Sequence, residues 1–293
     1  MLSILIPTYN YDCTNLVRDL HRQAECAGID YEIVVADDAS PIKECAERVR
    51  EINTWPNCRL IELDRNLGRA RIRNRLADEA RFEWLLFMDS DAEVISDSFI
   101  VDYLKHTDAD VVCGGLCHAD ALPSPEVSLR YAYEKRADKK RAACYREQRP
   151  YEQFITFCFM VRASVFQAIR FDDSITEYGH EDTLFGVELE RRKVNIRHID
   201  NPMRQGGIET NAEFVEKTRA ALRNLVLMED NMRNHSLLLK LYGVLHLIRL
   251  DGCIARWFSH NEDRLKGQLL ESTPQLRLFF LYKLGYYCSL KQE

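Results

Sequence analysis

An acidic triplet ends one of the apolar segments of this sequence: Asp89, Ser90 and Asp91 follow the run 83–88. A buried strand gains nothing from ending in clustered negative charge unless that charge is solvated, paired or bound to a cation. Hard carboxylate oxygens prefer Mg²⁺ or Mn²⁺, and such an ion can carry a phosphorylated ligand. A solvated acidic turn that caps the next helix is the alternative, so the triplet alone leaves both interpretations open.

Short apolar runs alternate with helical patterns over the first third of the chain. The expected strands are 2–6, 31–36, 59–63 and 84–88, and the expected helices are 15–27, 42–52 and 70–80. Near-continuous apolar strands separated by helices predict an α/β fold with a mostly parallel sheet flanked by helices. Ligands of such sheets bind beyond the carboxyl ends of the strands, where the acidic triplet stands.

Two other strand ends also carry polar residues, with Pro7-Thr8-Tyr9-Asn10 after the first strand and Asp37-Asp38 after the second. Together with further motifs they form an ordered set that resembles glycosyltransferase family 2, a family of inverting enzymes with a GT-A type fold. The motifs lie at 3–10, 32–40, 65–74, 89–91 and 178–182. Each is weak alone, but the ordered set is specific. The resemblance implies a Rossmann-like GT-A domain that binds a nucleotide sugar.

The resemblance implies a uridine pocket at the first two strand ends. It places Asp38 on the base, where a carboxylate can accept the N3–H of uracil, with Pro7, Thr8 and Tyr9 forming the walls. Asp37 or Asp38 could instead cap the helix that follows, and each residue could do one of the two jobs. The expected donor is a UDP sugar.

Five arginines lie between residues 65 and 75, around a helix start at Gly68. Arginine forks and helix N-termini both suit phosphate oxygens, so one face of this helix could bind a pyrophosphate while the other is solvated. Asn66 and Arg73 are the predicted pocket residues. In the resembling family, the first aspartate of the acidic triplet contacts the nucleotide and the last binds the metal, which are Asp89 and Asp91 here.

A second acidic pair opens the helical pattern at 182–192. Glu181 and Asp182 could simply favour the start of this helix, where negative charge is stabilising. The resemblance implies instead that Asp182 is the general base that accepts the proton of the acceptor hydroxyl, and that Glu181 hydrogen-bonds the acceptor sugar.

The remaining ligands of the predicted Mn²⁺ or Mg²⁺ are less well defined by the sequence. Related enzymes often carry a histidine shortly after an Asn-Pro pair, and here Gln205 takes that place. Either Gln205 substitutes, His198 takes over, or fewer protein groups hold the ion. His198 could equally be a buried strand histidine. If metal catalysis has been lost, the chain would be a nucleotide-sugar-binding protein with lost or weak transferase activity, but Asp91 and Asp182 argue against that.

Composition narrows the function class further. A length of 293 residues allows a large α/β domain plus an accessory unit, and a net charge of −6 argues against nucleic acid as a partner. No Gly-x-Gly-x-x-Gly follows the first strand, which argues against a dinucleotide-dependent oxidoreductase. Neither a secretory signal nor an apolar stretch of roughly 20 residues is visible, so the expected location is cytoplasmic.

Long helical patterns replace the strands after residue 210, which predicts a GT-A catalytic domain at 1–209 and a C-terminal helical region at 210–293. The run 237–250 is apolar around most of its circumference and carries sparse basic residues. It could lie on the inner face of a membrane as a peripheral anchor, or it could pack in a helical bundle. A membrane location would suit a lipid-linked sugar acceptor. The expected acceptor is a glycan or a lipid-linked sugar in polysaccharide biosynthesis.

Overall fold

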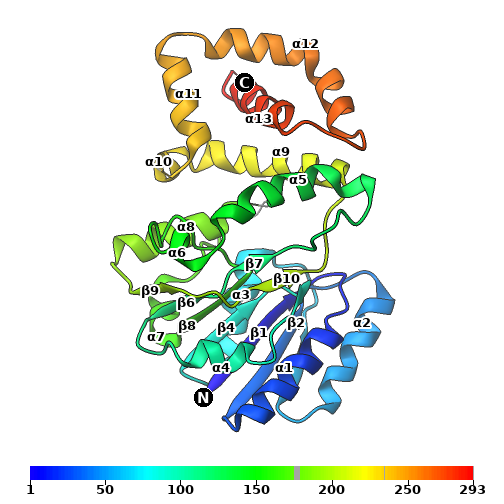
Figure 1. Cartoon of the computed structure of the whole chain (residues 1–293), viewed down its shortest axis with the longest axis vertical. Helices are drawn as coiled ribbons and strands as arrows, with labels where there is room; N and C mark the ends of the chain where they lie inside the picture. Colours follow the sequence, from blue (N-terminus) through cyan, green and yellow to red (C-terminus); the bar gives the residue numbers. More distant parts are fainter. Residues whose placement is uncertain (175–178, 234, 293) are drawn as a thin grey trace. The chain divides into compact units, whose positions relative to one another are not determined.

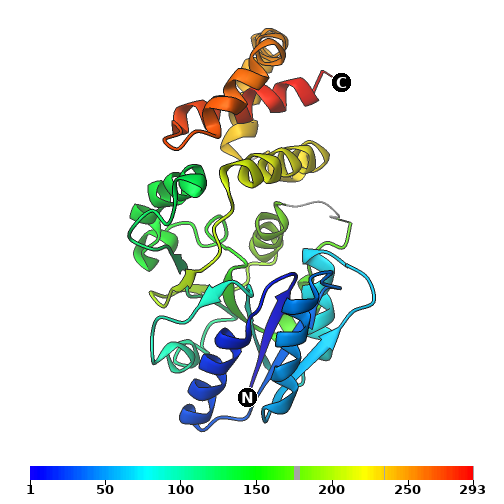
Figure 2. The ribbon, with the colours of Figure 1, turned by 90° about the vertical axis from the view of Figure 1, so that its right-hand side faces the viewer.

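The computed structural model describes residues 1–174, 179–233 and 235–292 (Figures 1 and 2). These residues form two compact units, of which unit 1 contains 1–118, 140–174 and 181–207. Unit 2 contains 119–139, 179–180, 208–233 and 235–292. The segment 119–139 therefore groups with the C-terminal helices although it lies in the middle of the chain. The boundary between residues 209 and 210 stays a prediction.

Unit 1 is built on a sheet that has seven strands within the described residues, in the order β3-β2-β1-β4-β8-β6-β9. The strands are β1 (Leu2–Thr8), β2 (Tyr31–Asp37), β3 (Cys58–Glu62), β4 (Trp84–Met88), β6 (Val111–Cys113), β8 (Cys158–Arg162) and β9 (Ile196–His198). Strand β8 pairs antiparallel with β4 and β6, and the other neighbours pair in parallel. The predicted mostly parallel sheet is confirmed.

Helices cover both faces of this sheet because its central strands are apolar on both sides. The helices of unit 1 are α1 (Thr14–Ala27), α2 (Lys43–Val49), α3 (Arg69–Glu79), α4 (Phe99–Leu104), α6 (Ala143–Arg146), α7 (Ala163–Ile169) and α8 (Glu181–Arg191). Ile4 of β1 joins one core cluster with α1 and α4, whereas its neighbour Leu5 joins another with α3, α7 and α8. This alternation is the strand period of two.

A second, three-stranded sheet adds residues that the sequence did not mark as strands. It consists of β5 (Ala92–Glu93), β10 (Met203–Gln205) and β7 (Leu116–Cys117), in the order β5-β10-β7. Its register pairs Gln205 with Ala92, which directly follows the acidic triplet. The small sheet thus brings the segment around residue 205 to the end of β4.

Unit 2 is helical, which agrees with the predicted C-terminal helical region. Its helices are α5 (Ser128–Ala137), α9 (Asn211–Leu227), α10 (Glu229–Met232), α11 (Leu237–Leu247), α12 (Asp251–Leu269) and α13 (Leu276–Leu290). Aromatic rings join them, with Phe258 of α12 on Tyr282 of α13 and Phe214 of α9 on Phe279. In the described part of the chain, no helix has both the length and the apolar character needed to cross a bilayer.

Candidate active site

The three polar strand ends lie at one edge of the large sheet, because β1 lies between β2 and β4. The parallel register pairs Thr8 with Asp37, and Asp89 follows the last residue of β4. Thr8 is buried and its hydroxyl donates to the carbonyl of Tyr11 at 2.9 Å. Tyr9 is exposed, so its ring is available to a ligand at this edge.

Asp37 and Asp38 each organise a loop in this structure. The Asp38 carboxylate accepts hydrogen bonds from the backbone N–H groups of Leu67 (2.7 Å) and Gly68 (3.0 Å), directly before α3. Burial raises the pKa of Asp38, and these two hydrogen bonds oppose the rise. Asp37 accepts from the backbone N–H of Ser40 at 3.3 Å. A carboxylate has about four acceptor positions, so a base contact by Asp38 remains compatible with these bonds and stays a prediction.

Asn66 and Arg73 occupy different environments. Asn66 is exposed and donates from Nδ2 to the carbonyl oxygen of Asp38 at 3.1 Å. Arg73 is buried, and its guanidinium lies 5.7 Å from the centre of the Phe171 ring. One Nη of Arg73 donates to Asp89 Oδ1 at 2.5 Å. Arg73 therefore anchors the first aspartate of the acidic triplet from α3.

Arg69 connects two acidic pairs, Asp89 with Asp91 and Glu181 with Asp182. No sequence motif indicated this role. Its Nε donates to Glu181 Oε1 at 2.6 Å, and an Nη donates to Asp89 Oδ2 at 3.2 Å. Glu181 begins α8 and Asp89 follows β4, so one guanidinium holds the two segments together. The available signal was the spacing of four residues between Arg69 and Arg73, which puts both on one side of α3.

Glu181 and Asp182 are adjacent in the sequence, yet their pKa values are shifted in opposite directions. Burial raises the pKa of Glu181, but the charges of Arg69 and Arg73 outweigh it and leave the pKa below its usual value. Burial, followed by the negative charge of Glu181, raises the pKa of Asp182 to about 6. Asp182 Oδ1 accepts from the backbone N–H of Thr183 at 2.7 Å. Tyr178, the first residue of this motif, lies outside the described residues.

Asp91 lies against Gln205, as the small sheet requires. Gln205 Nε2 donates to Asp91 Oδ2 at 3.3 Å, and the backbone N–H of Gly206 donates to the carbonyl of Asp91 at 2.8 Å. Burial, and then the charge of Asp89, raise the pKa of Asp91 to about 6. His118 Nε2 lies 3.2 Å from Gln205 Oε1. Sequence reasoning missed His118, because no motif surrounds it and only the β7–β10 pairing brings it here.

His198 has both ring nitrogens engaged in a buried cluster. Nδ1 lies 2.7 Å from an Nη of Arg146, and Nε2 lies 2.9 Å from the carbonyl of Pro150. The backbone N–H of His198 donates to Glu147 Oε1 at 2.6 Å. These contacts match the alternative of a buried strand histidine. To bind an ion, His198 would have to leave these partners, so its role as a metal ligand stays a prediction without support from the geometry.

The side chains present fit an ion held by few protein groups. No set of three or more His, Cys, Asp and Glu side chains among the described residues has the arrangement of a metal site. Asp91 nevertheless faces the Gln205 amide, whose nitrogen and oxygen can exchange places by a rotation. One carboxylate oxygen and one amide oxygen are hard donors, and Mg²⁺ commonly takes its other ligands from water and substrate phosphates.

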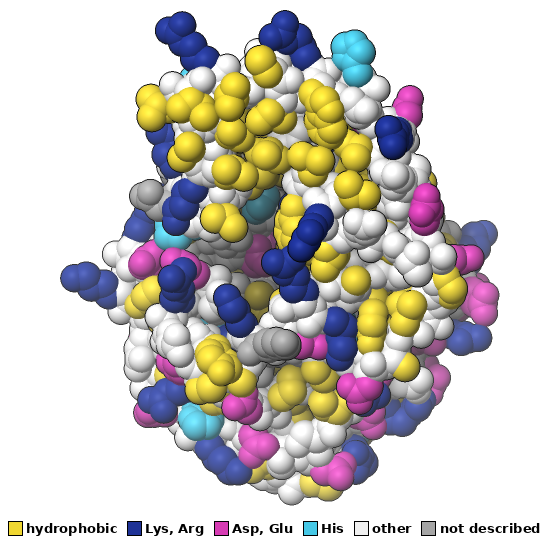
Figure 3. All heavy atoms as spheres, turned by 45° about the horizontal axis from the view of Figure 1, so that its top comes forward, with side chains coloured by type: hydrophobic (Ala, Val, Ile, Leu, Met, Phe, Trp, Pro, Cys, Tyr) yellow, Lys and Arg dark blue, Asp and Glu magenta, His cyan; other side chains and the backbone are white. Residues whose placement is uncertain are grey.

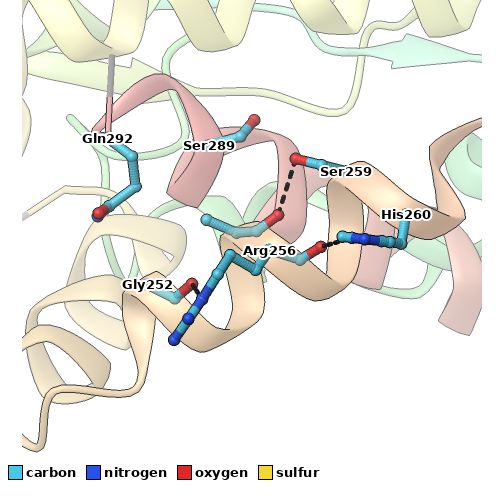
Figure 4. Close-up of a pocket in the computed structure, with 7 residues that line it drawn as sticks. Gly252, Arg256, Ser259, His260, Ser289 and Gln292 are labelled. Atoms are coloured by element: carbon cyan, nitrogen blue, oxygen red, sulfur yellow. Dashed lines mark hydrogen bonds between the residues drawn. The ribbon is translucent and has the colours of Figure 1, made fainter.

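A pocket of about 450 Å³ lies elsewhere, between α12 and α13 (Figure 4). It is lined by Gly252, Ala255, Arg256, Ser259, His260, Ser289 and Gln292. The hydrogen bonds drawn there join residues four apart within α12, such as Ser259 with the carbonyl of Ala255. These polar groups serve the helix itself, and the predicted site residues are not part of this pocket.

Comparisons with solved structures place this fold among the GT-A glycosyltransferases. Residues 1–349 of TarS from S. aureus, in complex with UDP-GlcNAc, match with a TM-score of 0.52 and 16% identity, over 99% of this chain and 90% of that one. The mannosyltransferase PcManGT from Pyrobaculum calidifontis, in complex with GDP-Man and Mn²⁺, matches with a TM-score of 0.55 and 14% identity, over 98% and 84%. A longer TarS structure matches with 20% identity and a TM-score of 0.51. That match covers 77% of this chain and 39% of the TarS chain.

The sequence itself identifies the family. The profile described as "Glycosyl transferase family 2" matches residues 3–170, more than half of the chain. This chain therefore belongs to glycosyltransferase family 2, which confirms the resemblance found in the motifs. No curated protein sequence matches it in a direct comparison.

Proposed function

We propose that this chain is an inverting glycosyltransferase that moves a hexose from a UDP sugar to a glycan or a lipid-linked sugar. The observation that carries the proposal is that the two carboxylates of each acidic pair have different environments. Glu181 and Asp89 are tied to Arg69, whereas the neighbours Asp182 and Asp91 each have a pKa raised to about 6. In the pair Glu181 and Asp182 the environments push the two pKa values apart, which is typical of acid–base roles.

Asp182 is the proposed general base. A pKa near 6 leaves the carboxylate ionised at neutral pH and still basic enough to take a proton from an acceptor hydroxyl. The deprotonating oxygen attacks the anomeric carbon on the side opposite the leaving diphosphate, so an α-linked donor gives a β-linked product. Glu181, already ionised and held by Arg69, accepts hydrogen bonds from the acceptor sugar.

The nucleotide is proposed to lie at the carboxyl ends of β1, β2 and β4. Tyr9 offers an exposed ring for the base, Asp38 offers a directional acceptor, and Pro7 and Thr8 complete the wall. Asn66, Arg73 and Asp89 lie toward the phosphate and ribose. One structural neighbour holds UDP-GlcNAc and another GDP-Man, so the preference for uridine rests on Asp38 in this proposal.

A divalent cation would be held by Asp91 and the amide oxygen of Gln205. When bound, it would neutralise the negative charge that develops on the leaving diphosphate. The mannosyltransferase neighbour is in complex with Mn²⁺. Asp89 anchors Arg69 and Arg73 through both of its oxygens, and the remaining acceptor positions of the carboxylate leave it available for the proposed nucleotide contact.

The proposed setting is polysaccharide biosynthesis on the cytoplasmic side of a membrane. A lipid-linked sugar acceptor would be presented at the membrane surface, so peripheral association through the C-terminal helices belongs to the proposal. The basis is the run of exposed apolar side chains on α11, which include Leu237, Val244 and Leu247.

A panel of nucleotides tests the donor class. Thermal shifts should be measured with UDP, GDP, UDP-GlcNAc, UDP-glucose and GDP-mannose, each with and without Mn²⁺. A uridine-selective rise in melting temperature is expected, because Asp38 is proposed to bind the uracil base. A ligand at about 100 times its dissociation constant adds about 2.7 kcal/mol of apparent stability. A guanosine-selective rise would refute the role of Asp38, and the absence of any shift would refute nucleotide-sugar binding.

The second candidate is a nucleotide-sugar-binding protein without transferase activity. The contact between Gln205 and Asp91 favours this candidate, because an amide lies where related enzymes often carry a histidine. Incubation with the nucleotide sugar that binds and with candidate acceptors separates the two candidates. Release of the nucleoside diphosphate supports the transferase. A thermal shift without release of diphosphate, across donors and acceptors, supports the binding protein.

A further inference from the structure

Helix α11 has one packed side and one open side. Leu239 and Tyr242 are buried, and the ring of Tyr242 lies 5.1 Å from that of Tyr287 on α13. The opposite side exposes four apolar side chains, Leu237, Leu241, Val244 and Leu247, and Ile248 directly after the helix is exposed as well. Their spacing of three and four residues puts them on a single side of the helix, and we call this surface the α11 stripe.

The charged residues of the segment that carries the α11 stripe are basic. Residues 236–250 contain Lys240 and Arg249 but no aspartate or glutamate, and both basic side chains are exposed. Asp251, which follows, is buried, and its Oδ2 lies 2.9 Å from Nδ1 of His246. In Figure 3, hydrophobic side chains gather in the upper part of the view, with lysine and arginine side chains at its upper and left margins and aspartate or glutamate side chains at its right margin. An apolar surface bordered by positive charge is complementary to anionic lipids.

A membrane span and a contact between two copies of the chain both fit the α11 stripe less well. A membrane-spanning role fails because no helix among residues 1–174, 179–233 and 235–292 is suited to cross a bilayer. A symmetric contact with a second copy would bring Lys240 and Arg249 close to the same residues of its partner, because a two-fold interface uses the same surface twice. Like charges brought together in this way oppose association.

We propose that the α11 stripe docks the protein on a membrane surface that contains anionic phospholipids. Helix α11 would lie in the plane of the interface, with its leucines among the acyl chains and with Lys240 and Arg249 at the lipid phosphates. The biological role of this docking rests on the proposed function, because a lipid-linked acceptor would be found at such a surface. The binding itself needs no sugar transfer.

Co-sedimentation with lipid vesicles tests the docking. The full chain is mixed with vesicles of phosphatidylcholine alone, or of phosphatidylcholine with one-third phosphatidylglycerol. Binding is expected to the anionic vesicles and to weaken with added salt, since each basic residue near the surface contributes about fivefold in affinity. Leu247→Glu should reduce this binding by at least about tenfold, because it removes buried apolar surface and adds a negative charge.

Leu227→Glu is the matched control. Leu227 ends α9 as Leu247 ends α11, and both side chains are 82% exposed. The control should bind anionic vesicles like the unaltered chain, and circular dichroism melting should show both variants folded. The double variant Lys240→Gln/Arg249→Gln provides a second test, with an expected loss of about 25-fold and of the salt dependence.

Three results would overturn the docking proposal. They are a lack of binding to anionic vesicles, an equal loss in the two leucine variants, and a dimer in sedimentation velocity that Leu247→Glu dissociates. The last would assign the α11 stripe to a second copy. Nucleotide thermal shifts on the same preparations keep the two proposals apart. Intact shifts without vesicle binding would refute the docking and the peripheral membrane association but leave the donor assignment standing, whereas vesicle binding without shifts would refute the donor assignment alone.

Discussion

The two acidic pairs of unit 1 lie in different parts of the fold but follow the same arrangement. At the end of β4, Asp89 bonds Arg69 and Arg73, while Asp91 meets the neutral amide of Gln205. At the start of α8, Glu181 bonds Arg69, while Asp182 accepts from Thr183. In each pair the first carboxylate accepts hydrogen bonds from arginine, and the second has its pKa raised to about 6.

This comparison shows how neighbouring carboxylates acquire separate roles. An arginine contact stabilises the ionised form, whereas burial beside another negative charge disfavours it. The first member of each pair is thus suited to anchor segments, and the second is suited to take up a proton or a cation. Arg69 couples the two pairs because it touches the anchoring member of both.

The largest expected effect separates the members of the pair at α8. Asp182→Asn should lower kcat by roughly 10²- to 10⁴-fold, because the side chain can no longer accept a proton. The nucleotide-induced thermal shift should persist, since Asp182 is proposed to act on the acceptor and not on the nucleotide. Glu181→Gln is the matched substitution and should lower kcat much less. Steady-state release of nucleoside diphosphate measures both, and the opposite ranking would exchange the two roles.

Substitutions of Asp89 and Asp91, the pair at β4, should change the free energy of unfolding in opposite directions. Asp89→Asn leaves the buried guanidinium of Arg73 without its carboxylate, so the free energy of unfolding should fall by about 3–5 kcal/mol. Asp91→Asn should raise it at pH 7.5 without metal, by up to about 3 kcal/mol, because a raised pKa means that the ionised side chain destabilises the folded state. Urea denaturation with a chelator present measures both changes.

The pH dependence provides a check on the Asp91 substitution. Its folded pKa of about 6 is above that of an unfolded aspartate, so the ionisation penalty is complete above pH 6 and disappears as the pH falls toward 4. The advantage of Asp91→Asn should therefore be about half as large at pH 5. An advantage that does not depend on pH would show that it comes from packing and not from charge.

The smallest effect concerns the pH profile of turnover. Because Asp182 must be ionised to act as a base, kcat should fall as the pH drops below about 6. Glu181→Gln removes a negative charge that raises the pKa of Asp182, so this fall should move to lower pH. At pH 5 the variant should retain more of its own maximal rate than the unaltered chain, on the order of threefold. A fall at unchanged pH would mean that the charge of Glu181 has no influence on the base.

Sequence patterns predicted the elements of unit 1 well, because strand and helix periodicity is a local property. The strand 84–88 and the helix predicted at 70–80 appear as β4 and as α3 (Arg69–Glu79). The acidic triplet was correctly placed after a buried strand. The short strands β5, β7 and β10 were not predicted, because two or three residues carry too little pattern to be recognised.

The partners of the site residues were much harder to predict. Arg69 and Glu181 are 112 residues apart, and no pattern predicted their contact. Asp91 and Gln205 are 114 residues apart, and only the family resemblance put them at one site. No spacing rule connects such residues, since their meeting depends on which strands become neighbours. His118 was missed for the same reason, and His198 is held in a buried cluster by Arg146, a residue that carries no motif.

The sequence alone determined the α/β class, the family and the identity of the acidic pairs, because these depend on local periodicity and on motifs read in order. The tertiary structure decided which carboxylate of each pair meets an arginine, and which side of α11 remains exposed. These outcomes depend on burial and on contacts between distant segments, and both arise only when the sheets and helices assemble.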